Sequence, residues 1–157
     1  MKKGRITVLL VFILVQTAFI WTNSVLSQES SGQMSGELTS LIKDMLGLRE
    51  RVSDEFLHHI IRKTAHFTEF FILGALYTMI RACLPVKIRS ALLIFPAFAT
   101  LATAVTDEFI QLFTNRGSSV SDVVLDFCGA LCAIIIFELV IYLYRTNKAL
   151  KRGEGSE

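Results

Sequence analysis

Ionisable side chains recur at the ends of apolar segments, where a segment that only had to span a membrane would carry none. Lys63, His66 and Glu69 follow one another at every third position, and a rise of about 1.5 Å per residue places them within roughly 9 Å along a helix. Further polar candidates follow at Asp107, Glu108, Gln111, Arg116, Ser119, Asp122 and Asp126. A charge in lipid costs on the order of 2.5–3.5 kcal/mol on insertion scales. We therefore expect these groups to turn inward and to pair around a hydrated pocket.

These residue types predict acid–base chemistry or the binding of an anion. Imidazole and carboxylate groups can take up and release protons, so the candidate catalytic residues are His66, Glu69, Asp107, Glu108 and Asp122. Cationic and polar side chains can hold a phosphate or carboxylate, so the candidate substrate-binding residues are Lys63, Arg116, Gln111, Asp126 and Ser119.

A divalent cation is a further interpretation of the acidic residues. Carboxylate oxygens are ligands that suit Mg²⁺ or Mn²⁺, and they are offered by Asp107, Glu108, Asp122 and Asp126. Their spacing identifies no metal site. We therefore assign no residue as a metal ligand, and the cofactor stays open.

Structural roles for the same residues are the alternative interpretation. Ser119 and Asp122 could cap a following helix, Lys63 could extend to lipid head groups, and His66 with Glu69 could form one pair between two helices. For each residue alone, a structural role explains the sequence equally well. The complete set favours a functional pocket, because locking helices together needs fewer ionisable groups.

Four apolar segments must position these residues. The chain has 157 residues, of which 52 % are hydrophobic and 19 % are charged, whereas soluble domains carry ~25 % charged residues. This composition excludes a disordered chain, a disulfide scaffold and a nucleic-acid binder that relies on bulk charge. Long apolar runs predict transmembrane helices at 6–26, 64–84, 88–111 and 123–144. The expected fold is all-α, an integral membrane four-helix bundle. Pro96 lies inside the third helix, where it should kink the helix or be tolerated through neighbouring contacts.

The distribution of basic residues predicts the orientation of these helices. The N-terminus (1–5), the short turn after the second helix and the tail (145–157) are rich in Lys and Arg and should be cytoplasmic. The segments 27–63 and 112–122 should lie outside.

Two elements of this topology have alternative interpretations. The spacing of apolar residues from Leu38 to Leu57 fits an amphipathic helix at the outer interface, and a plain connector is the favoured alternative. The first helix could be a cleaved signal peptide, although its apolar run is long for one, and we favour retention.

Glu138, near the inner end of the fourth helix, should pair with a Lys or Arg and has no catalytic role. Cys128 and Cys132, beside Gly129, favour packing over metal binding.

Three ordered motifs resemble the VanZ-like family of small bacterial membrane proteins. Residues 63–70 are similar to its Lys-x-x-His-Phe-x-Glu-Tyr motif, and residues 107–113 match its Asp-Glu-x-x-Gln-x-Phe pattern. The residues that fit the following Arg…Ser…Asp…Asp/Asn…Gly series are Arg116, Ser119, Asp122, Asp126 and Gly129. The resemblance covers a domain of residues 60–145. The sequence departs from the pattern at Phe70, at Ile110 where many relatives carry His, and at Thr114–Asn115, which replace Pro-Gly.

The resemblance implies a multi-pass protein of the bacterial cell membrane whose namesake is associated with resistance to teicoplanin-type glycopeptides. We expect the pocket to act on or bind a lipid-linked or membrane-proximal envelope substrate. The alternatives are a non-enzymatic shielding protein and a proton- or ion-coupled carrier, so enzymatic activity stays open. The expected partners are membrane lipids and an anionic, lipid-linked envelope precursor, without nucleic acid, and the oligomeric state stays open.

Overall fold

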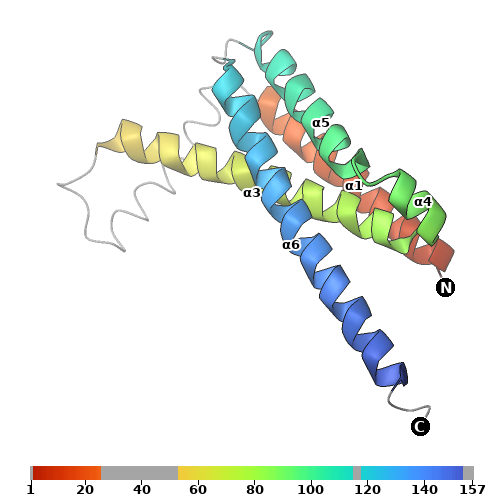
Figure 1. Cartoon of the computed structure of the whole chain (residues 1–157). Helices are drawn as coiled ribbons and strands as arrows, with labels where there is room; N and C mark the ends of the chain where they lie inside the picture. The colour runs from red at the N-terminus through yellow and green to blue at the C-terminus, as the bar shows by residue number, and fades with distance from the viewer. Residues whose placement is uncertain (1, 26–52, 115–117, 154–157) are drawn as a thin grey trace.

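The chain folds into helices alone wherever its structure is described. The computed structural model describes residues 2–25, 53–114 and 118–153. Its helices, in chain order, are α1 (Lys2–Val25), α3 (Asp54–Cys83), α4 (Val86–Ala91), α5 (Phe95–Gln111) and α6 (Val120–Gly153) (Figure 1). The described residues contain no strand, which confirms the all-α class.

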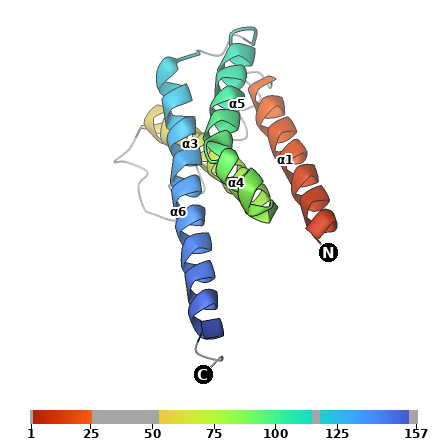
Figure 2. The ribbon, with the colours of Figure 1, turned by 45° about the vertical axis from the view of Figure 1, so that its right-hand side comes forward.

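Helix α3 is the central element. It contacts α1, α5 and α6, and α5 also contacts α1 and α6. Figure 1 shows α3 crossing α6, and Figure 2 shows α5 between α1 and α6. In both views the C-terminal part of α6 extends beyond the other helices. The first half of α6 therefore belongs to the packed part of the molecule.

Local sequence explains where α3 begins and ends. Ser53 caps the helix by accepting a hydrogen bond from the Phe56 amide at 3.3 Å, and Asp54 and Glu55 lie in the first turn, where the helix dipole favours acidic groups. The helix ends at Cys83 because Leu84, which precedes a proline, is extended. Helix α3 thus begins before the predicted membrane span of 64–84, and its first turns come from the predicted outer segment.

The third predicted helix is in fact two helices. Residues 86–91 form α4, residues 95–111 form α5, and Pro96 lies in the first turn of α5. Proline is tolerated there because the first amides of a helix have no acceptor within it. Pro96 therefore does not kink a continuous helix, because it lies in the first turn of a new one.

Two of the helices are long and apolar enough to cross a membrane, within Gly4–Val25 and Val120–Lys151. Helix α5 is shorter, at 17 residues. The predicted fourth span (123–144) lies wholly inside α6, which continues through most of the expected tail. The predicted amphipathic helix lies outside the described residues, except at 53–57, where α3 begins.

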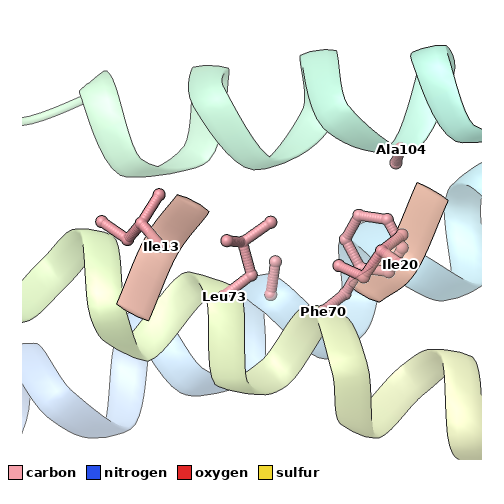
Figure 3. Packing of buried hydrophobic residues seen from close by; sticks show 6 residues of the cluster. Ile13, Ile20, Phe70, Leu73 and Ala104 are labelled. Atoms are coloured by element: carbon pink, nitrogen blue, oxygen red, sulfur yellow. The ribbon is translucent and has the colours of Figure 1, made fainter. Parts of the chain in front are cut away.

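The exterior is strongly apolar, and the interior holds many polar groups. The buried apolar cluster joins Ile13 and Ile20 of α1 to Phe70 and Leu73 of α3 and Ala104 of α5 (Figure 3). The buried polar or charged residues are Ser24, Thr78, Arg81, Thr100, Thr103, Asp107, Glu108, Gln111, Asp122 and Asp126. Large apolar side chains are exposed along α1 and α6, among them Val11, Phe12, Leu14, Ile135, Leu139 and Leu143. Such a surface is unfavourable in water and is expected of helices that face lipid.

Two glycines allow α3 and α6 to cross closely. A Cβ atom at Gly74 would lie 2.6 Å from the Ala130 carbonyl oxygen, and one at Gly129 would lie 2.4 Å from the Phe67 carbonyl oxygen. Gly129 and Ala130 are buried, whereas Cys128 is exposed. The small residues of this turn therefore provide the predicted helix packing, and the cysteine lies on another side of α6.

Gly74→Ala and Gly129→Ala should each lower the thermal stability of the purified protein. Each new methyl group would meet backbone of the opposite helix, and overpacking of this kind typically costs about 1–3 kcal/mol. Gly4→Ala is the matched control, because a Cβ atom there has nothing within 4 Å. Unfolding of the three variants in detergent checks the crossing. Melting of all three at the wild-type temperature would contradict it.

Candidate functional site

Five side chains from four helices meet beside the crossing of α3 with α6. We call them the deep group: Ser24 of α1, His66 of α3, Asp107 and Gln111 of α5, and Asp126 of α6. Asp107 is 0 % exposed and Asp126 is 1 % exposed. Two carboxylates thus lie fully inside the helix bundle.

Neighbouring side chains hold Asp107 in place. The Ser24 hydroxyl donates to Asp107 Oδ1 at 2.6 Å, and the Gln111 amide donates to Asp107 Oδ2 at 2.9 Å. Gln111 reaches Asp107 because residues four apart on a helix are neighbours. These bonds orient the carboxylate and join α1 to α5.

Asp126 is held differently. His66 Nδ1 lies 3.9 Å from Asp126 Oδ1, and neither carboxylate oxygen of Asp126 has a hydrogen-bond partner among the described residues. Burial of a polar group without a partner costs free energy. Potential ligand atoms of His66, Asp107 and Asp126 all lie within 4.8 Å of one another. Asp126 is therefore the residue in the deep group whose environment most calls for an explanation.

A second set of side chains lies at the N-terminal end of α6. We call it the loop-end group: Lys63, Glu108, Ser119 and Asp122. Lys63 forms a hydrogen-bonded ion pair with Asp122 Oδ1, and Arg62 NH2 lies 3.9 Å from Asp122 Oδ2. Lys63 thus neutralises a carboxylate of α6, and its side chain is 24 % exposed.

Ser119 has the structural role that was one alternative for it. Its hydroxyl accepts a hydrogen bond from the Ser121 amide at 3.2 Å, which is the geometry of an N-cap for a helix that starts at Val120. The Ser119 amide donates to Glu108 Oε2 at 2.9 Å. Ser119 therefore caps α6 and also joins it to the end of α5.

Glu69 connects α3 to α1. Asn23 Nδ2 donates to Glu69 Oε1 at 3.0 Å, and Gln16 Nε2 donates to the Glu69 carbonyl oxygen at 3.1 Å. Glu69, Asp107, Glu108 and Asp122 all lie close enough to Asp126 to act on it electrostatically. The structure thus gathers the five predicted carboxylates in one region.

The predicted site residues are therefore neighbours, apart from Arg116, which lies outside the described residues. Their catalytic and substrate-binding roles stay predictions. Glu138 is remote from this region and forms an ion pair with Arg81, which confirms the predicted pairing with a basic residue.

Sequence reasoning missed the contribution of α1. The first helix supplies Gln16, Asn23 and Ser24, which bind predicted site residues. Its apolar run by itself predicts only a membrane span. A signal was present, because positions 16, 20, 23 and 24 share one face of a helix and three of them are polar in a mostly apolar segment.

Comparison with known protein families gives a match over most of the chain. The family model described as VanZ/LLP1 matches residues 6–142, which includes α1 and so extends well beyond the resemblance at 60–145. No curated protein and no solved structure gave a significant match. The match includes every described helix that supplies a side chain to the deep and loop-end groups. The chain belongs to the VanZ/LLP1 family.

Proposed function

We propose that this chain is a multi-pass protein of the bacterial cell membrane. Its polar cluster, which comprises the deep group, the loop-end group and Glu69, faces outward and acts on or binds an anionic, lipid-linked envelope substrate. In this proposal α1, α3, the α4–α5 pair and α6 are the four membrane passes. The observation that carries it is the burial of several carboxylates between helices with apolar outer surfaces, next to the partly exposed side chains of Lys63 and His66. Structural locking of helices would need fewer ionisable groups.

The loop-end group supplies the anion-binding part of the proposal. Lys63 and Arg62 lie side by side on Asp122, and each is partly exposed. Asp122 holds Lys63 and Arg62 in position, and the remaining N–H donors of these two cations can bind a phosphate or carboxylate of a substrate, since charge-assisted hydrogen bonds of this kind are strong. The lipid part of the substrate would lie along the apolar outer surfaces of the helices.

The deep group supplies the proton-transfer part. His66 has a ring nitrogen near Asp126, and Asp107 is oriented by two hydrogen bonds. Such an arrangement suits a general acid and a general base whose positions are fixed before the substrate binds.

The orientation of this site is itself testable. Reporter fusions at Lys148 and at Asn115 should report opposite compartments, with Lys148 inside, because basic residues concentrate near the C-terminus. Fusions that report the same compartment would overturn the outward orientation of the cluster.

The proposed function is tested by expressing the chain in a glycopeptide-susceptible bacterium. We expect growth at teicoplanin concentrations that stop the vector control, and unchanged growth without the drug. Equal inhibition of both strains, with the protein present in the membrane, would contradict a role in glycopeptide resistance.

Two further assays separate the alternatives. Turnover of a labelled lipid-linked precursor by the purified protein supports an enzyme, whereas saturable binding without turnover supports shielding. A proton flux into proteoliposomes that depends on the protein would instead support a carrier.

A further inference from the structure

We propose that His66, Asp107 and Asp126 form a binding site for one divalent transition-metal cation, with Zn²⁺ as the expected metal. The three residues come from α3, α5 and α6, and their potential ligand atoms lie within 4.8 Å of one another. Metal binding uses the same lone pairs that proton transfer by His66 and Asp107 would use, so a bound cation replaces the acid–base role proposed for them. The metal content is measured without any substrate, so the site can be tested independently of the proposed function.

Asp126 provides the second observation that points to a ligand. Its carboxylate is 1 % exposed, and neither oxygen has a hydrogen-bond partner among the described residues. It lies beside His66 Nδ1 and within reach of the buried carboxylate of Asp107. Two buried acidic groups repel each other, and a divalent cation between them would neutralise both. It would also bind the Asp126 oxygens, to which the described residues donate no hydrogen bond.

The ligand set favours zinc over magnesium. Zn²⁺ binds His nitrogen and Asp oxygen atoms, and catalytic zinc sites have three protein ligands and one open position. Magnesium prefers oxygen ligands throughout. Tetrahedral zinc with bonds of about 2.0–2.2 Å brings ligand atoms to about 3.4 Å from one another. The ligand atoms lie within 4.8 Å of one another, so binding of the cation requires side-chain rotations that shorten these distances by up to about 1.4 Å.

The surrounding residues fit this assignment. Ser24 and Gln111 each donate to one oxygen of Asp107, and a carboxylate oxygen keeps a second lone pair for a metal. Hydrogen bonds of this kind orient metal ligands in proteins. These three ligands differ from the metal ligands considered from the acidic residues alone, which included Glu108 and Asp122. Glu108 accepts from the Ser119 amide and Asp122 is paired with Lys63.

The experiment measures metal in the full-length protein. The protein is purified in detergent without chelators, its metal content is measured, and the affinity of the EDTA-stripped protein for Zn²⁺, Mn²⁺ and Mg²⁺ is then determined. We expect about one zinc per chain, as a site with three protein ligands requires, and weaker binding of Mg²⁺. Protein that retains no cation, and that binds none after stripping, overturns the proposal.

Variants locate the site. Asp126→Asn and His66→Gln should weaken zinc binding at least about tenfold, and Ser24→Ala, which keeps all three ligands, should also weaken it by about tenfold or more. Asp122→Asn, one turn from Asp126 on the same helix, should bind zinc as the wild type does. The double variant His58→Ala/His59→Ala controls for adventitious binding to these adjacent histidines. Loss of zinc in this double variant, with retention in Asp126→Asn, overturns the proposal. If Asp126→Asn fails to fold, Ser24→Ala decides.

Discussion

His66→Gln, Glu108→Gln and Asp122→Asn should each reduce protection against teicoplanin at least about tenfold, because a hydrogen bond to a charged group contributes about 1.5–3 kcal/mol. Each substitution keeps a polar side chain of similar size and removes the imidazole or the negative charge. Membrane abundance should hold or rise, since burying a neutral amide costs less than burying a charge. Growth under the drug, normalised to the amount of protein in the membrane, is the measurement.

Glu55→Gln is the matched control for these variants. Glu55 lies in the first turn of α3 and is exposed, so the same chemical change there should leave protection unchanged. A shielding protein predicts a different pattern, in which substitutions in the 38–57 segment matter as much as those in the cluster. Full protection by all three cluster variants at normal abundance would mean that these charges are structural.

Arg81→Met should lower the free energy of unfolding more than any other single substitution proposed here. Arg81 is 4 % exposed, pairs with Glu138 of α6 and donates to the Arg89 carbonyl oxygen at 2.9 Å. Breaking a buried ion pair by removing one partner costs about 3–5 kcal/mol. Because the Glu138 side chain is 33 % exposed, we expect a value near the lower end of that range, about 3 kcal/mol. Thermal unfolding in detergent measures this loss.

Two controls separate the ion pair from the cation alone. Arg89→Met removes a neighbouring guanidinium but keeps the main-chain carbonyl that Arg81 binds, so it should melt close to the wild type. Arg81→Met/Glu138→Gln leaves no unpaired charge and should recover part of the loss. Equal stability of Arg81→Met and Arg89→Met would rule out the ion pair as a major support of the packing of α3 on α6.

The sequence was sufficient to predict the helical class and the gathering of the carboxylates. The helical class follows because backbone polar groups in lipid need partners within their own segment. The gathering of the carboxylates follows because a charge on a helix in lipid must face the protein interior. That constraint acts on every polar residue in an apolar segment, so Asp107, Glu108, Asp122 and Asp126 could be grouped before their positions were known.

Helix boundaries and pairings were harder to predict. Hydropathy does not distinguish a proline inside a helix from one in its first turn, so the sequence predicts one helix over 88–111 where the structure has α4 and α5. The partners of Glu69 were missed because α1 lies far away in the sequence. Spacing along one segment contains no information about which polar face of another helix lies opposite.

Spacing also places Asp122 and Asp126 on one face of the fourth predicted helix, because they are four residues apart. The structure gives them different neighbours. Asp122 lies near the capped end of α6 and pairs with Lys63, whereas Asp126 lies one turn deeper, beside His66 and without a hydrogen-bond partner among the described residues. Only the position of α3 relative to α6, fixed by close packing at Gly74 and Gly129, separates these two environments.

The central claim is that the buried charges bind an envelope substrate, and direct binding tests it. A labelled lipid-linked cell-wall precursor is titrated onto the full-length protein in lipid nanodiscs, with Glu55→Gln as the control and Asp122→Asn and Lys63→Gln as the variants. We predict saturable binding to the wild type and to Glu55→Gln, and a loss of affinity of about tenfold or more in both cluster variants. Absence of saturable binding to the wild type, or equal affinity of all four proteins, would contradict the account.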